Sequence, residues 1–237
     1  MIPLKDDTPS TLRPRVTIAL IAACGAAFLW QCSLDDNTSR RAVEALGAIP
    51  AVLLARARLP PDLQWVPRFA TVFTSMFLHG GWSHIIGNML FLYAFGRSLE
   101  DAMGHNKFLG FYFATGIIAG IVQVFFNLDS RIPTVGASGA IAGVMGAYIV
   151  KFPRAEIRTL IWVIFFVTTV DIPAILLLGF WFLSQIFSVG EIAHTHQVTD
   201  SGVAFFAHIG GFVAGMILVN VMGTRQRYFP PGRSLRW

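Results

Sequence analysis

Residues 203–222 read VAFFAHIGGFVAGMILVNVM, twenty consecutive residues without a charged side chain. A helix of about 20 apolar residues is long enough to cross the hydrocarbon core of a bilayer. The stretch therefore predicts a membrane-spanning helix. It also contains a histidine, His208, and a polar side chain inside a membrane span is costly enough to suggest a function.

Five more apolar stretches precede this one, at residues 16–32, 76–95, 108–126, 138–152 and 160–187. Together they predict an all-α polytopic membrane protein whose domain, residues 16–222, is a bundle of six transmembrane helices. The composition of the 237 residues agrees, because 54% are hydrophobic, only 13% are charged and the mean hydropathy is +0.61. Such a chain has too few charges for a soluble enzyme or a disordered protein.

Two segments do not fit a simple span. Residues 34–74 mix charges with prolines, and we expect an external loop with short amphipathic helices. Residues 160–187 are longer than one span and are interrupted by Asp171 and Pro173. We expect part of this stretch to lie along the membrane interface.

The positive charges predict the orientation. Six spans place both termini on one side, and if that side is the cytoplasm it holds 12 of the 18 Lys and Arg residues. Residues 1–15 and 223–237 are then cytoplasmic segments. The net charge of +5 is scattered over segment ends, so we expect no nucleic-acid partner. The N-terminus lacks an Arg- and Ser-rich leader, which favours a bacterial plasma membrane over an organelle.

Four polar residues fall at similar depth in the expected spans. In this topology the second, fourth and sixth spans all run inward from the outer face, which places His84, Asn88, Ser138 and His208 in the outer half of the bilayer. His84 and Asn88 are four residues apart and share one helix face. Two plainer interpretations remain open: His79, His84 and Asn88 hold the bundle together through interhelical hydrogen bonds, or Ser138 merely caps a helix.

Small residues suggest how the polar residues meet. Two Gly-x-x-x-Gly faces occur, one formed by Gly139 and Gly143 and the other by Gly211 and Gly215. Such faces let helix backbones approach closely, and ordinary helix packing in a membrane is enough to explain them. If these faces pack together, Ser138 and His208 come within hydrogen-bond distance, as a serine nucleophile and its base require. His84, Asn88 and the Ser138 backbone amide would then stabilise an oxyanion. We find no acidic residue to orient His208, so the sequence predicts a dyad without cofactor or metal.

Three blocks together resemble the rhomboid family of intramembrane serine proteases: FLHGGWSHIIGN at 77–88, GASGA at 136–140 and AHIGGFVAG at 207–215. Supporting similarity lies in FGRSLED at 95–101 and LGFWFLSQ at 178–185. The resemblance implies a six-helix bundle with a water-filled cavity open to the non-cytoplasmic side. It also implies Ser138 as nucleophile, His208 as general base, and His84, Asn88 and the Ser138 amide as the oxyanion hole.

The expected partners follow from the same resemblance. They are the lipid bilayer and transmembrane protein substrates. The family cuts such substrates near their outer ends, with a preference for small residues at the cut, through an acyl-enzyme. The alternative is a non-catalytic rhomboid-like binder of membrane helices in quality control, but such relatives usually lack the serine or the histidine. Two positions depart from the family pattern: Ala70 and Thr71 replace a loop Trp-Arg pair, and Ala142 replaces an aromatic residue that stacks on the histidine in some members.

Overall fold

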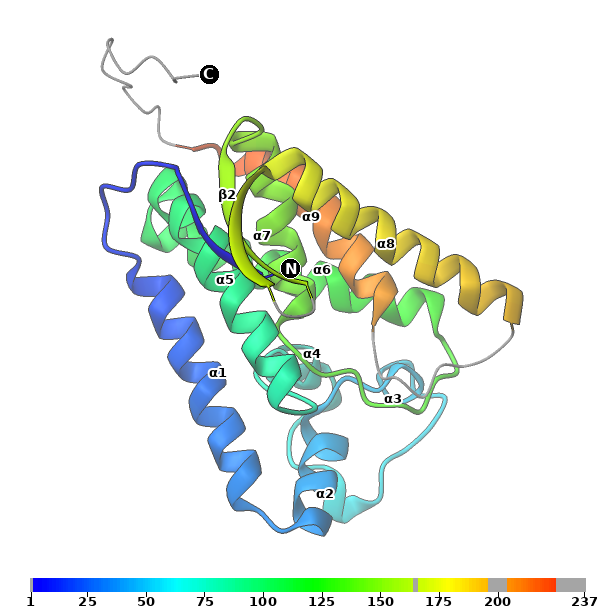
Figure 1. Ribbon diagram of the computed structural model, residues 1–237. Helices are drawn as coiled ribbons and strands as arrows, with labels where there is room; N and C mark the ends of the chain where they lie inside the picture. Colours follow the sequence, from blue (N-terminus) through cyan, green and yellow to red (C-terminus); the bar gives the residue numbers. More distant parts are fainter. Residues whose placement is uncertain (1, 164–165, 196–203, 225–237) are drawn as a thin grey trace, which may run out of the picture.

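A computed structural model describes residues 2–163, 166–195 and 204–224 (Figure 1). The fold is mostly helical. Its six long helices are α1 (Arg15–Ser33), α5 (Trp82–Met103), α6 (His105–Phe126), α7 (Ser138–Lys151), α8 (Ala174–Thr195) and α9 (Phe205–Met222). The segment between α1 and α5 forms short helices: α2 (Asp36–Leu46), α3 (Pro50–Leu53), η1 (Pro61–Leu63), η2 (Arg68–Ala70) and α4 (Thr71–Thr74).

Helix α7 is the centre of the bundle. Every residue from Gly139 to Tyr148 is buried, and the helix contacts α5, α6, α8 and α9. Its small residues, Gly and Ala, allow four neighbours to surround one helix closely. Helices α5, α7 and α9 run in the same direction, so their N-terminal ends lie toward one end of the molecule (Figure 1).

The exterior of the bundle is strongly apolar. Phe180, Phe187 and Val221 are 71%, 72% and 75% exposed, an arrangement that suits contact with lipid tails. Within the described ranges, α1, α6 and α9 are long and apolar enough to cross a membrane, whereas α7 and the part of α8 up to Val189 are apolar but shorter. The outward side chains of α8 and α9 are thus apolar, as expected for a bundle that lies in a bilayer.

The expectation of an all-α fold is wrong in one place, because the structure contains a three-stranded antiparallel sheet. Its strands are β1 (Ile2–Asp6), β2 (Glu156–Val163) and β3 (Phe166–Pro173), in the order β1-β2-β3. The span expected from residue 160 therefore begins only at Ala174, in α8. Side chains alternate at the start of β2, where Ile157 and Thr159 are buried and Glu156 and Arg158 are exposed, and β-branched residues favour this pleated arrangement. Arg158 and Asp171 pair across the two strands, with 3.0 Å between Nε and Oδ1.

The second long helix, α5, begins and ends later than residues 76–95. It starts after Gly81, whose φ of +157° suits glycine, and continues to Met103. Its last turn carries the buried carboxylates of Glu100 and Asp101. Glu100 accepts hydrogen bonds from the Val16 and Thr17 backbone amides at 2.9 and 2.8 Å. The charge is thus used to cap the N-terminus of α1, which hydropathy alone does not reveal.

Replacing Glu100 by alanine is expected to loosen the contact between α1 and α5. The change leaves the first amides of α1 without acceptors inside the protein, which costs on the order of 3 kcal/mol for a buried charged hydrogen-bonding group. Thermal unfolding in detergent should show a clearly lower midpoint for Glu100→Ala. Glu44→Ala, at an exposed position, is the matched control, and equal midpoints for the two variants would contradict this role.

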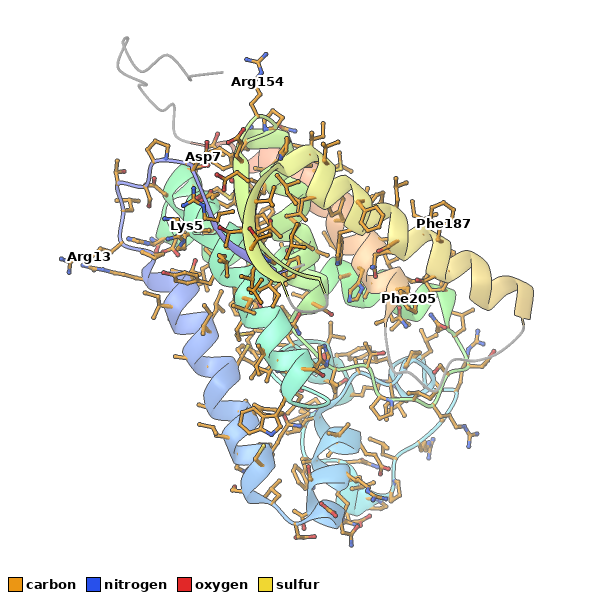
Figure 2. The ribbon with its side chains drawn as sticks, viewed as in Figure 1. Lys5, Asp7, Arg13, Arg154, Phe187 and Phe205 are labelled. Atoms are coloured by element: carbon orange, nitrogen blue, oxygen red, sulfur yellow. The ribbon has the colours of Figure 1, made fainter. Side chains whose placement is uncertain are left out.

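Charged side chains of both signs, among them Lys5, Asp7 and Arg154, lie at the end of the bundle where the sheet lies. Figure 2 shows Lys5, Arg13 and Arg154 toward this end, around the sheet and the start of α1. The N-terminal ends of α5, α7 and α9, which carry the candidate site residues, point away from it. The candidate site and the sheet therefore lie at different ends of the molecule.

Candidate active site

Ser138 is held at the start of α7 by a tight turn. Gly136 has a φ of +122°, which favours glycine, and its amide donates to the Ser75 carbonyl at 2.8 Å. The preceding Ala137 is the helix N-cap, and no side chain of the described residues caps the N-terminus of this helix. The Ser138 hydroxyl is therefore not a cap. Its oxygen lies 2.8 Å from Nε2 of His208, which comes from α9.

The close approach of α7 and α9 depends on glycine. A Cβ atom on Gly211 would overlap the carbonyl oxygen of Gly139, and one on Gly215 would overlap that of Gly143. The backbones of the two helices are thus in direct contact along the faces formed by these four glycines. His208 stands one turn before this contact, so the packing determines its distance from Ser138.

His84 and Asn88, on the first turns of α5, face the turn that leads to Ser138. A Cβ atom on Gly136 would lie 2.8 Å from Nε2 of His84 and 3.7 Å from Nδ2 of Asn88. The Gly80 amide donates to Nδ1 of His84 at 3.3 Å, so the neutral ring carries its proton on Nε2. Two N–H donors, from His84 and Asn88, therefore lie beside this turn.

Neither donor is used to join helices in the part of the chain that the structure describes. Among the described residues, the hydrogen-bond partner of the His84 ring is the backbone amide of Gly80, close by in the chain. The Asn88 side chain is buried, and its amide nitrogen has no hydrogen-bond partner among the described residues. An unpaired buried donor is costly and suggests a ligand or a transient charge. His79, by contrast, is fixed through its backbone, which exchanges hydrogen bonds with Gln31 of α1.

Sequence reasoning missed two neighbours of His208, both on α8. Oε1 of Gln185 lies 2.8 Å from Nδ1 of His208, and the Trp181 ring is tilted against the imidazole with centroids 5.7 Å apart. Both residues belong to the block at 178–185, but the sequence gives no sign of which face of α8 meets α9. Trp181 also supplies the aromatic neighbour that Ala142 cannot provide.

The arrangement has the parts of an acyl-transfer site. A hydroxyl contacts an imidazole nitrogen, and further N–H donors lie beside it. The Ser138 amide adds another donor, because the first amides of a helix have no acceptor within the helix. Ser138 lines a small cavity together with other small residues, among them Gly116, Ala119 and Gly139, and with larger side chains that include Met76 and Gln123.

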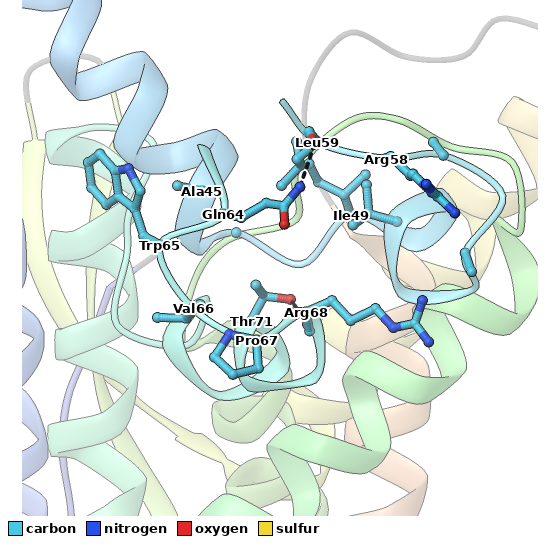
Figure 3. Close-up of a pocket in the computed structure, with 14 residues that line it drawn as sticks. Ala45, Ile49, Arg58, Leu59, Gln64, Trp65, Val66, Pro67, Arg68 and Thr71 are labelled. Carbon is cyan, nitrogen blue, oxygen red and sulfur yellow. Dashed lines mark hydrogen bonds between the residues drawn. The ribbon is translucent and has the colours of Figure 1, made fainter. Parts of the chain in front are cut away.

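A larger pocket of about 660 Å³ lies apart from these residues, in the segment between α2 and α4 (Figure 3). Arg58, Trp65 and Arg68 line it, and Gln64 donates to the Leu59 carbonyl at 2.8 Å. It contains none of the residues expected to form the site.

Comparisons with known proteins identify the fold. A family model for the rhomboid domain matches residues 66–225. Rhomboid protease GluP of Bacillus subtilis is 30% identical over 213 residues, covering 89% of this chain and 35% of that protein. RHOMBOID-like protein 5 of Arabidopsis thaliana is 29% identical over 168 residues, which cover 68% of this chain and 48% of that protein. The mitochondrial Rhomboid protein 1 of Saccharomyces cerevisiae is 30% identical over 151 residues, which cover 62% of this chain and 40% of that protein.

The chain spans about a third to a half of the length of these relatives. The domain match nevertheless covers most of this chain, including the turn at Gly136, the start of α7 and all of α9. The chain therefore belongs to the rhomboid family of integral membrane proteins.

Proposed function

We propose that this protein is an intramembrane serine protease that hydrolyses peptide bonds in or near transmembrane segments of other membrane proteins. The observation that carries the proposal is the 2.8 Å contact between the Ser138 hydroxyl and Nε2 of His208, inside a bundle with a lipid-facing exterior. The match to Rhomboid protease GluP covers 89% of this chain, and the name of that relative supports the same reaction.

In the proposed reaction, the Ser138 oxygen attacks the carbonyl carbon of the peptide bond while its proton moves to Nε2 of His208. The carbon–nitrogen bond then breaks, and the departing amine takes that proton. Water attacks the resulting ester and gives a proton to Nε2. The ester bond breaks, the carboxylic acid leaves, and the proton returns to Ser138. Serine and histidine thus act as a dyad, and no metal or cofactor takes part.

Three donors would stabilise the negative oxygen of each tetrahedral intermediate. They are the Ser138 amide, Nε2–H of His84 and the side-chain amide of Asn88. All belong to, or lie beside, the turn at Gly136, and fixed donors need no reorganisation when the charge forms. The unpaired state of the buried Asn88 nitrogen supports this role, since an oxyanion would provide its missing partner.

The proposed protease has six spans in a bacterial plasma membrane with both termini in the cytoplasm, and the distribution of Lys and Arg along the sequence supports this orientation. Lys5, Arg13 and Arg154, near the sheet, would then lie on the cytoplasmic side, where Lys and Arg are usually in excess. The site then faces the opposite side, so that it meets the outer ends of substrate helices. A helical substrate must unwind there, because its peptide carbonyls are otherwise held in backbone hydrogen bonds.

A non-catalytic binder of membrane helices is the alternative. Such a protein needs neither a serine in contact with a histidine nor donors left unpaired beside it. The presence of both reacting groups therefore favours catalysis.

Reconstitution with a single-span reporter substrate in liposomes tests the proposal. The substrate should carry a small residue near its outer end, and mass spectrometry should identify both fragments. Cleavage at one bond within or next to the span is the expected result. Binding of the intact substrate without cleavage, by correctly folded protein, would favour the non-catalytic alternative.

Asn88→Ala is expected to reduce kcat by about 100- to 1,000-fold with little change in KM, because one donor to the oxyanion acts only in the transition state. Asn220→Ala is the matched control, since Asn220 is exposed on α9 and bonds to Lys151. Steady-state cleavage in liposomes measures both constants. An Asn88→Ala enzyme as fast as Asn220→Ala would remove Asn88 from the oxyanion hole.

A further inference from the structure

The second ring nitrogen of His208 has its own partner. Nε2 faces Ser138 of α7, whereas Nδ1 lies 2.8 Å from Oε1 of Gln185 of α8. A neutral imidazole carries one proton, on one nitrogen or the other. Only the form protonated on Nδ1 leaves a lone pair on Nε2 for the Ser138 proton. The partner of Nδ1 therefore decides whether His208 can act as a base.

The hydrogen bonds around Gln185 fix which end of its amide meets the histidine. The Ser184 hydroxyl donates to the Trp181 carbonyl at 2.6 Å, so its oxygen is left to accept. Nε2 of Gln185 lies 3.0 Å from that oxygen and 3.5 Å from the Trp181 carbonyl oxygen. Both are acceptors, so the NH2 end of the amide belongs there. The oxygen of the amide must then face His208, where it can only accept.

The placement of Gln185 on α8 is equally specific. It is 9% exposed, whereas Leu183 and Ile186 beside it are 51% and 44% exposed on the outer side of the helix. A buried polar side chain in a membrane helix is costly unless it is paired. The neutral amide of Gln185 provides a hydrogen-bond acceptor without placing a charge in the bundle. An aspartate at this position would place a negative charge there.

We infer that Gln185 is a positioning residue, which holds His208 in the tautomer protonated on Nδ1 and directs the Nε2 lone pair at the Ser138 hydroxyl. The inference rests on the proposed function and extends its dyad to a chain of three residues from three helices. When the serine proton reaches Nε2, the ring becomes cationic. Its Nδ1–H bond to the amide oxygen is then charge-assisted and stronger, so the contact favours the transition state.

Two variants of equal length separate positioning from packing. Gln185→Met removes the acceptor and keeps the volume, whereas Gln185→Glu keeps an oxygen acceptor in either protonation state. Leu183→Met, on the outer side of α8, is the control for a change in this helix. Cleavage of the reporter substrate in liposomes gives kcat and KM for each.

We expect Gln185→Met to lower kcat by about 100-fold at nearly unchanged KM, since loss of the correct tautomer removes general base catalysis. Gln185→Glu should stay within about tenfold of wild type, because the acceptor remains. Leu183→Met should cleave like wild type. Equal loss of kcat in the Met and Glu variants would indicate packing and overturn the inference.

Nitrogen NMR of histidine-labelled protein in detergent, at mildly alkaline pH, gives a readout that does not depend on cleavage. The His208 signals are those absent from His208→Ala. We expect the proton on Nδ1 in wild type and a shift toward the Nε2-protonated form in Gln185→Met.

The failures are distinguishable. A wild-type His208 protonated on Nε2, or a Gln185→Met enzyme with wild-type kcat, would overturn the inference while the proposed protease remains. Folded wild-type protein that never cleaves the reporter would overturn the proposed function and the inference together.

Discussion

Ser138→Ala and His208→Ala are each expected to reduce cleavage of the reporter substrate by a factor on the order of 10⁴ or more. Alanine at 138 removes the attacking oxygen. Alanine at 208 leaves the serine hydroxyl without the nitrogen that lies 2.8 Å away to take its proton. Both losses should appear in kcat, because neither group is needed to hold the substrate before reaction.

The double variant sharpens this prediction. Groups that act as a unit are not additive, so Ser138→Ala with His208→Ala should be no slower than either single variant. Ser33→Ala, at an exposed position at the end of α1, is the control for a serine change. Independent, multiplicative losses in the double variant would show that the two residues do not act together.

Gly215→Ala is expected to destabilise the fold and to disturb the candidate site. The new Cβ atom would overlap the Gly143 carbonyl oxygen, and backbone cannot give way as a flexible side chain can. Helix α9 must then move from α7, at a cost of about 3 kcal/mol, and the unfolding midpoint in detergent should fall on the order of 10 °C. Because His208 lies on the same helix, the shift also separates it from Ser138, so activity should fall even in molecules that remain folded.

Gly179→Ala is the matched control on α8. A Cβ atom there meets nothing within 4 Å, and alanine is the better helix former. Its unfolding midpoint should equal or exceed that of wild type. If Gly215→Ala were equally harmless, direct backbone contact between α7 and α9 would be excluded.

Hydropathy was sufficient to predict the bounds of helices whose outer surface is apolar along their whole length. The stretch at 108–126 corresponds to α6, and that at 203–222 to α9, with ends within three residues. It failed where charge or strand pairing decides the structure. Glu100 and Asp101 extend α5 because the N-terminal segment supplies their partners. Residues 160–163 and 166–173 pair as strands although they belong to a stretch that is apolar enough to predict a span.

The candidate site was predictable to the extent that its residues fall in short patterns. Ser138 stands in a small-residue block, and His208 stands one turn before a Gly-x-x-x-Gly face, so their proximity followed from helix packing. Gln185 was not predictable, because its partner is 23 residues away and the rotation of α8 determines the contact. The orientation of its amide depends in turn on Ser184 and Trp181, which are visible only in three dimensions.

Labelling of the purified protein in detergent with a fluorophosphonate tests the activated serine most directly, and it needs no knowledge of the substrate. Wild type should react, and peptide mass analysis should place the adduct on Ser138. Ser138→Ala and His208→Ala should both remain unlabelled while keeping the wild-type unfolding midpoint. An adduct on another serine, or His208→Ala labelled as fast as wild type, would contradict the proposed Ser138–His208 dyad.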